Sequence, residues 1–206
     1  MNGSSKKTSG KRAVVIAAII AGAILLGFLV DLTWGKLEEV THPKSYSAYV
    51  RQYAYEFNVP ESIIYAVIKV ESDFDPNAES GVGARGLMQM MPSTFEELTS
   101  DAYLGDNLSA DELFDPEVSI KYGTYYLSYL HSYFDHNWDT AIAAYNGGMG
   151  NVSKWLADPA YSDGEGNLTS IPFEETRNYV SKVKKEIESY KKLYYEDQEE
   201  VKNYEE

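Results

Sequence analysis

An uninterrupted run of uncharged residues, AVVIAAIIAGAILLGFLV, occupies positions 13–30 of this 206-residue chain. Its 18 residues reach the lower limit of length for a helix that spans a bilayer. Leu32 and Trp34 extend the run past Asp31, and tryptophan is common at the membrane–water interface. We therefore expect residues 13–34 to form a single transmembrane anchor, with residues 1–12 as a basic tail before it.

The charges before this run predict its orientation. Four basic residues and no acidic residue precede it: Lys6, Lys7, Lys11 and Arg12. The positive-inside rule then places the N-terminus in the cytoplasm and the rest of the chain outside the cell membrane. A cleaved signal peptide is the alternative. The run is longer than a usual signal core, and no clear small-x-small cleavage site follows it, so an uncleaved single-pass anchor is the favoured interpretation.

The charge and composition of the remaining chain exclude several functions. All 32 acidic residues but only 14 of the 18 basic residues follow residue 12, so this part carries a net charge of −18. Such a surface repels nucleic-acid phosphates, and it equally serves solubility. The chain has no cysteine, and its histidines are His42, His131 and His136, without metal-ligand spacing. We therefore expect no nucleic-acid partner, no disulfide, no metal and no cofactor.

The pattern beyond the anchor is mainly helical. Residues 35–44, with Pro43 as a breaker, are expected to form a connector, 45–192 a folded domain and 193–206 an acidic tail. Capping-box patterns begin at Ser93 and Ser109, and Asp115-Pro116 is typical of a helix start. The fold class is therefore all-α, with a small hairpin expected at most in the glycine-rich segments. Helices are expected over 45–57, 60–71, 116–133, 139–145, 151–156 and 173–195, with a loop over 161–170.

Glu71 occupies a position where an ionised carboxylate is unfavourable. Ile64, Val67, Ile68 and Glu71 follow helical spacing, so the carboxylate lies on the apolar stripe of the predicted helix. Desolvation favours a protonated carboxyl, which is what general acid catalysis near neutral pH requires. The alternative is a glutamate at a frayed helix end that reaches water. Position alone favours this alternative, because buried glutamate is uncommon.

The segment after Glu71 contains a glycine-rich run, GVGARGLMQMMP, over positions 81–92. Gly81, Gly83 and Gly86 permit tight turns and close approach of the backbone to a ligand. The Lys-Ser/Thr ending of a phosphate-binding loop is missing. The methionines and Leu87 are best explained as core residues. Gln89 stands out among them, because a buried amide must find hydrogen-bond partners, and sugar hydroxyl or acetamido groups are one such class.

Two further segments have ordinary structural explanations when each is taken alone. In AIAAYNGG, positions 141–148, Tyr145 and Asn146 end a predicted helix, where their side chains can point into a binding site. Asn and Gly are also common residues at the end of a helix. The segment PFEETRNYV, positions 172–180, has the composition of a normal helix start and includes Tyr179.

Together, and in this order, these segments resemble the lytic transglycosylase family related to goose-type lysozyme. The resemblance covers about residues 45–191. The matching pieces are Glu71-Ser72, Ser80 with Gly83-Ala84, the run 86–92, Ala144-Tyr145-Asn146 and Glu175 to Val180. The run 147–150, GGMG, departs from the family, which often has alanine, glycine and proline there.

The resemblance implies an all-α lysozyme-like domain that cleaves the β-1,4 bond between MurNAc and GlcNAc in peptidoglycan glycan strands. It implies that Glu71 is the sole catalytic acid and base, and that the product is a 1,6-anhydro-MurNAc end. The residues that it assigns to sugar binding are Ser80, Gln89, Met91, Tyr145, Asn146 and Tyr179. The folded domain would then act on the cell-wall side of the membrane; no partner among cell-wall synthesis proteins follows from the sequence.

Two other interpretations stay open. A hydrolytic muramidase would use the same acid and differ only in letting water attack instead of the C6 hydroxyl. A membrane-tethered peptidoglycan-binding scaffold would keep the sugar site without turnover, but binding alone does not need a proton donor at Glu71.

Overall fold

The computed structural model describes residues 5–100 and 102–195 of the chain. The chain divides into two compact units, Met1–Pro43 and Lys44–Glu206. The described part of the first unit is dominated by helix α1 (Ser5–Thr41). Helix α1 thus continues through most of the expected connector and ends two residues before Pro43, because the residue before a proline disfavours helical geometry. Residues 1–4 of the basic tail and 196–206 of the acidic tail lie outside the described residues.

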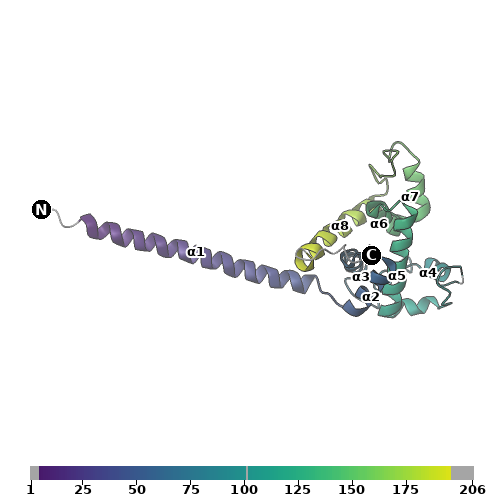
Figure 1. Ribbon diagram of the computed structural model, residues 1–206, viewed down its shortest axis with the longest axis horizontal. Helices are drawn as coiled ribbons and strands as arrows, with labels where there is room; N and C mark the ends of the chain where they lie inside the picture. The colour runs from purple at the N-terminus through teal and green to yellow at the C-terminus, as the bar shows by residue number, and fades with distance from the viewer. Residues whose placement is uncertain (1–4, 101, 196–206) are drawn as a thin grey trace. The chain divides into compact units, whose positions relative to one another are not determined.

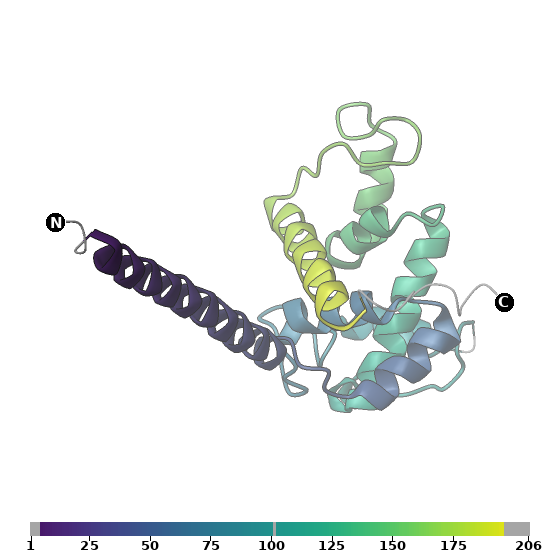
Figure 2. The same ribbon diagram turned by 60° about the vertical axis from the view of Figure 1, so that its left-hand side comes forward.

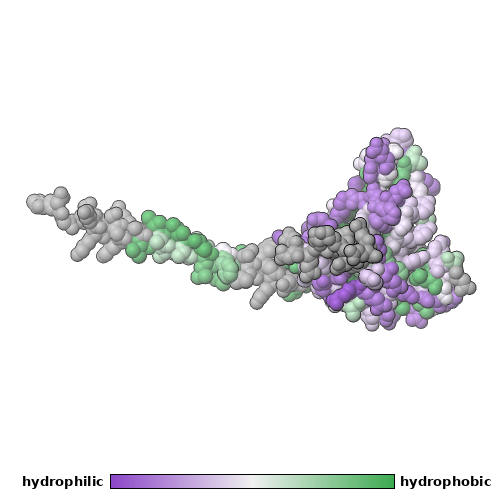
Figure 3. All heavy atoms as spheres, viewed as in Figure 1, coloured by the Kyte–Doolittle hydropathy of each residue, from purple (hydrophilic) through white to green (hydrophobic). Residues whose placement is uncertain are grey.

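The side chains of α1 from Val14 to Val30 are exposed and largely apolar. Figure 3 shows them as a hydrophobic section of this helix. Among the described residues, none of the helices combines the length and the apolar character that crossing a membrane requires. The transmembrane span expected over 13–34 is therefore not confirmed.

The second unit is built from helices, as Figures 1 and 2 show. Its helices are α2 (Ser47–Phe57), α3 (Glu61–Ser72), α4 (Pro92–Leu98), the 3-10 helix η1 (Ala110–Phe114), α5 (Pro116–Tyr133), α6 (Trp138–Gly147), α7 (Met149–Leu156) and α8 (Glu174–Tyr194). Helix α3 packs against α8 and α2, α5 packs against α2 and α6, and α6 also contacts α7 and α8. Pairing of β type occurs in the described residues only as isolated bridges, in the two glycine-rich segments. The all-α fold class is confirmed.

Helix α3 lies in the core of this unit, because seven consecutive residues, 62–68, are buried. Its main neighbour is α8, which is amphipathic and buries one residue every three to four positions, among them Tyr179, Val183 and Tyr190. The rings of Tyr65 on α3 and Tyr190 on α8 stack with centroids 5.2 Å apart. This packing holds the C-terminal turn of α3, which carries Glu71, in a fixed place.

Of the three helix starts that the sequence signals predict, one forms with its cap. The Asp115 carboxylate accepts hydrogen bonds from the backbone N–H groups of Glu117 and Val118, so it is the N-cap that the Asp-Pro pair predicts. The capping box predicted at Ser93 is wrong, because α4 already begins at Pro92, and proline suits the first helical position. Ser109 does precede η1, but its side chain makes no capping hydrogen bond.

Candidate functional site

Glu71 lies in the last turn of α3, half-buried. Burial raises the pKa of its carboxyl from 4.5 to about 7. The nearby Tyr179 hydroxyl acts in the opposite direction and lowers that pKa. The hydroxyl stabilises the ionised carboxylate through a polar interaction that falls outside ordinary hydrogen-bond geometry and counts for less than burial. A carboxyl in this state can hold a proton near neutral pH and release it, as a general acid and base must.

Two tyrosines, the buried Tyr179 and the half-buried Tyr145, share the surroundings of Glu71. Tyr179 on α8 is 7% exposed, and its hydroxyl has no hydrogen-bond partner among the described residues. Tyr145 on α6 donates a hydrogen bond to the Met88 carbonyl at 2.8 Å. Burial and the Glu71 charge raise the pKa of both phenols well above the usual value. Both hydroxyls therefore stay protonated, and they present neutral polar groups beside the carboxyl.

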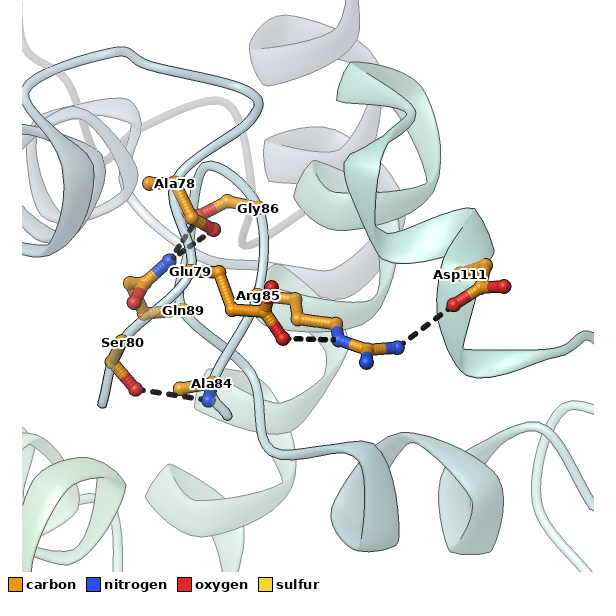
Figure 4. Close-up of polar contacts among 8 residues, drawn as sticks. All are labelled: Ala78, Glu79, Ser80, Ala84, Arg85, Gly86, Gln89 and Asp111. Atoms are coloured by element: carbon orange, nitrogen blue, oxygen red, sulfur yellow. Dashed lines mark hydrogen bonds and ion pairs between the residues drawn. The ribbon is translucent and has the colours of Figure 1, made fainter. Parts of the chain in front are cut away.

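The glycine-rich loop after α3 contains Ser80 and Gln89, which both stabilise the loop itself (Figure 4). The Gln89 amide nitrogen donates to the carbonyls of Ala78 and Gly86, both at 2.9 Å. The Ser80 hydroxyl accepts a hydrogen bond from the Ala84 N–H at 2.9 Å. The Gln89 amide was expected to need hydrogen-bond partners, and its nitrogen finds them in these two backbone carbonyls. Its side-chain oxygen accepts no hydrogen bond from the described residues.

Arg85 connects this loop to η1, and sequence reasoning missed it. Its guanidinium pairs with Glu79 at 3.3 Å and with Asp111 on η1 at 2.9 Å (Figure 4). Both carboxylates are at least half exposed, so each pair contributes little to stability. Asp111 is 26 residues from Arg85 in the sequence. No local spacing could have predicted a contact over that separation.

Three side chains from three helices hold the backbone of Leu87 and Met88. The Ser72 hydroxyl on α3 donates to the Leu87 carbonyl at 2.8 Å. The Met88 N–H donates to the hydroxyl of Ser119 on α5 at 3.2 Å, and the hydroxyl of Tyr145 on α6 donates to the Met88 carbonyl. Ser72 and Ser119 were not predicted as site residues. Their roles depend on contacts between distant segments, although Ser72 is the direct neighbour of Glu71.

Met91 and Asn146 differ from the other predicted site residues. Met91 is 39% exposed directly before α4, and Asn146 is exposed in the last turn of α6, next to Tyr145. Neither side chain is hydrogen-bonded to Glu71. The structure therefore brings Tyr145 and Tyr179 to Glu71, places Ser80 and Gln89 in one loop, and leaves Met91 and Asn146 exposed beside these elements.

The other carboxylates close to Glu71 in sequence are engaged elsewhere. Asp73 caps α3 in a left-handed conformation, with φ of 50°, and pairs with Lys69. Asp75 accepts a hydrogen bond from the Asn77 N–H at 2.9 Å. None of these carboxylates shifts the pKa of Glu71. Within the described part of the chain, no cluster of His, Asp and Glu side chains is arranged to hold a metal ion.

The amino-acid sequence matches a known protein family and named relatives. The family model of the transglycosylase SLT domain matches residues 48–167. The soluble lytic murein transglycosylase of Escherichia coli (strain K12) is 38% identical over 151 residues, which are 73% of this chain and 23% of that protein. The membrane-bound lytic murein transglycosylase C of Serratia proteamaculans (strain 568) is 30% identical over 189 residues, with coverages of 82% and 52%. The chain thus spans about a quarter of the first relative and about half of the second.

Solved structures agree with the sequence matches. The 70 kDa soluble lytic transglycosylase of Escherichia coli superposes with a TM-score of 0.70 at 34% identity, covering 80% of this chain and 26% of that one. A complex of the 70 kDa soluble lytic transglycosylase with bulgecin A gives a TM-score of 0.69 at 36% identity, with coverages of 76% and 25%. The lytic transglycosylase Slt of Pseudomonas aeruginosa, solved as an inactive glutamate-to-glutamine variant, gives 0.66 at 38% identity, with coverages of 75% and 25%.

Proposed function

The chain belongs to the transglycosylase SLT domain family, and on this premise we propose that it is a peptidoglycan lytic transglycosylase that uses Glu71 as its only acid and base. The observation that carries the proposal is the Glu71 carboxyl, whose pKa burial raises to about 7. A carboxyl with that pKa is protonated in a large fraction of molecules near neutral pH. Its conjugate base is also accessible in the same pH range, so one group can serve both halves of the reaction.

The proposed reaction needs a single carboxyl. Glu71 protonates the oxygen of the bond between MurNAc and GlcNAc, and the bond to C1 of MurNAc breaks. The oxygen of the MurNAc N-acetyl group stabilises the positive charge at C1, as in the substrate-assisted exceptions to two-carboxylate glycosidases. Glu71, now ionised, removes the proton of the C6 hydroxyl, whose oxygen bonds to C1 and yields the 1,6-anhydro end. The pairing of Asp73 with Lys69 supports this scheme, because it leaves that carboxylate unsuited to act as a second catalytic group.

Six residues are proposed to contact the glycan. Tyr145 and Tyr179 lie beside Glu71 and are proposed to border the sugar at the reacting bond. The Gln89 side-chain oxygen and the Ser80 hydroxyl proton have no hydrogen-bond partner among the described residues. We propose that the first accepts a hydrogen bond from a sugar group and that the second donates one. Met91 and Asn146, both exposed, are proposed to contact rings farther along the strand.

We further propose that residues 13–34 anchor the protein in the cell membrane and that the catalytic domain acts on the cell-wall side. The uncharged run 13–30, the helical conformation of α1 and the four basic residues before the run support this. A relative named as membrane-bound is consistent with it. The test is extraction of cell membranes with alkaline carbonate, which leaves a spanning protein in the pellet. Release of the intact chain would contradict the anchor, and a shortened chain would favour a cleaved signal peptide.

The activity is tested by digesting purified peptidoglycan with the full chain in detergent, with the Glu71→Gln variant in parallel, and reading the products by mass spectrometry. Products with 1,6-anhydro ends are one water lighter than hydrolysis products and have no reducible end. Such products, absent with the variant, would support the lytic transglycosylase. Reducing ends would indicate the hydrolytic muramidase with the same acid. Glycan binding without products from the folded protein would favour the scaffold.

A further inference from the structure

Four tyrosines form a continuous line of ring contacts that leads away from Glu71. The rings of Tyr145 and Tyr126 have centroids 5.5 Å apart. Tyr126 and Tyr129 follow at 6.5 Å, and Tyr129 and Tyr133 at 6.3 Å. The last three share one face of α5, since residues three and four apart are neighbours on a helix. We call Tyr145, Tyr126, Tyr129 and Tyr133 the tyrosine row.

The two ends of the tyrosine row lie at different places in the fold. At one end, Tyr145 is close enough to Glu71 for the carboxylate charge to raise the pKa of the phenol. At the other end, Tyr133 lines a pocket of about 250 Å³. The residues that line the pocket come from the C-terminal end of α5, from α7 and from the 161–170 loop. Its lining residues are Tyr133, Phe134, Asp135, Ser153, Leu156 and Gly166.

The rings of the row are more exposed than a purely structural role needs. Tyr122, on the same helix, is fully buried and packs edge-on against Phe95. By contrast, Tyr126 and Tyr129 are only half-buried, and Tyr133 is 51% exposed. Tyrosines placed only to fill the core would resemble Tyr122. The row instead keeps part of each ring accessible from the region of Glu71 to the pocket.

We propose that the tyrosine row and the pocket at its end form an extended binding track for the glycan strand on one side of the cleavage position. This inference rests on the proposed function, because it identifies the strand as the ligand. Flat aromatic rings with a polar edge suit sugars, whose rings have apolar C–H faces and polar rims.

The length of the track predicts how the enzyme responds to substrate length. Tyr126 and Tyr133 are seven residues apart, which corresponds to about 10 Å along the helix axis. With Tyr145 and the pocket added, the track is longer than a single sugar ring. A long glycan strand can therefore contact all of it, whereas a fragment that fills only the positions beside Glu71 cannot reach Tyr133.

The test compares Tyr133→Ala and Tyr129→Ala with the wild-type full chain on peptide-free glycan strands and on the shortest fragment that is cleaved. Loss of one stacking ring should lower kcat/KM on long strands roughly threefold to tenfold, and should leave the short fragment unaffected. Tyr133→Phe keeps the ring and should retain most of the activity. Tyr55→Ala, which removes a 73% exposed tyrosine outside the row, is the matched control. Because Tyr133 is half exposed, its variant should fold normally, which circular dichroism checks.

Equal losses on long and short substrates, or no loss on either, would overturn the track. If the wild-type protein cleaves nothing, the proposed function fails separately. In that case, binding of the same long strands to the wild type and to Tyr133→Ala, measured by calorimetry, decides the question. Weaker binding to the variant would support the track, and unchanged or absent binding would refute it.

Discussion

The Ser72 hydroxyl donates a hydrogen bond of 2.8 Å to the Leu87 carbonyl and so ties the residue next to Glu71 to the glycine-rich loop. The neighbouring Met88 backbone is held from two other helices, by Ser119 and Tyr145. These contacts fix the loop that carries Gln89 relative to the carboxyl of Glu71. Side chains that position a reacting group act through such supporting hydrogen bonds, and small displacements of the group lower the rate.

We expect Ser72→Ala to destabilise the protein by about 1 kcal/mol, the usual net worth of a hydrogen bond, and to lower kcat as well. Ser128→Ala is the matched control, because the Ser128 hydroxyl donates to the Phe57 carbonyl at 2.7 Å and so joins α5 to the end of α2, without a hydrogen bond to the glycine-rich loop. Urea unfolding and initial rates measure the two effects. A kcat of Ser72→Ala equal to that of Ser128→Ala would show that the first contact only stabilises the fold.

The pKa of Glu71, raised to about 7 by burial, determines the expected pH dependence of activity. The first step needs the protonated form, so kcat/KM should fall about tenfold per pH unit well above pH 7. Tyr179 lowers the pKa of Glu71, so Tyr179→Phe should move this inflection to higher pH. Rates on soluble glycan strands across pH 5–9 test both statements. An inflection that moves to lower pH in the variant would contradict the assigned effect of Tyr179.

The Glu71 carboxyl also makes the stability of the folded protein depend on pH. Its stability should fall as pH rises, whereas a salt-bridged carboxylate makes stability rise with pH. The folded-state pKa of Glu71 is about 7 and the ordinary value is 4.5, so between these pH values the folded state binds more protons and stability falls as pH rises. At pH 8 the ionised carboxylate costs roughly 3 kcal/mol. Glu71→Gln should therefore be more stable than the wild type at pH 8 and about equal near pH 4. Urea midpoints at the two pH values test this, and a variant less stable at pH 8 would contradict it.

Gly86 should tolerate no side chain. Its φ is +74°, and a Cβ atom would lie 1.9 Å from the Leu113 carbonyl oxygen, so the loop and η1 would have to separate. We expect Gly86→Ala to cost roughly 2–4 kcal/mol. Gly81, in the same loop, has nothing within 4 Å of a built Cβ, so Gly81→Ala is the control and should be nearly neutral. Thermal melts of both variants provide the comparison, and equal melting temperatures would refute the clash.

Asp73→Asn should keep substantial activity. The Asp73 side chain is exposed and pairs with Lys69, one turn earlier on α3, rather than facing Glu71. An exposed pair of this kind contributes at most about 1 kcal/mol, so the variant should also fold. Rates on peptidoglycan measure the effect. Complete loss of activity in a folded Asp73→Asn protein would favour a mechanism with two carboxylates.

Local patterns in the sequence were sufficient to predict most of the helices and the place of Glu71 on one of them. The spacing of Ile64, Val67, Ile68 and Glu71 predicts a helix with the carboxylate on its buried stripe, and α3 has that arrangement. The Asp115-Pro116 pair likewise predicts the start of α5. These predictions hold because helix periodicity and capping depend on residues within a few positions of each other.

The bounds of some helices could not be predicted, because neighbouring residues gave more than one acceptable start or end. One is the start of α4, where Pro92 and the capping-box pattern at Ser93 are adjacent. The helix begins at Pro92 rather than after Ser93. The continuation of α1 to Thr41 is another, since residues 35–41 contain no helix-breaking residue before Pro43. In both cases the element was expected but its bounds were misplaced: α4 begins earlier, and α1 begins at Ser5, inside the expected tail, and ends later.

The sequence by itself therefore determined an all-α domain with an unusual carboxyl at the end of a buried helix. Only the tertiary structure decided what surrounds that carboxyl: Tyr145 and Tyr179, the hydrogen bond from Ser72 to the loop, and the tyrosine row that leads to a separate pocket. Tyr145 and the Met88 carbonyl are 57 residues apart in the chain and 2.8 Å apart in space. Such contacts follow from how α3, α5, α6 and α8 pack, and packing depends on the whole core rather than on any short segment.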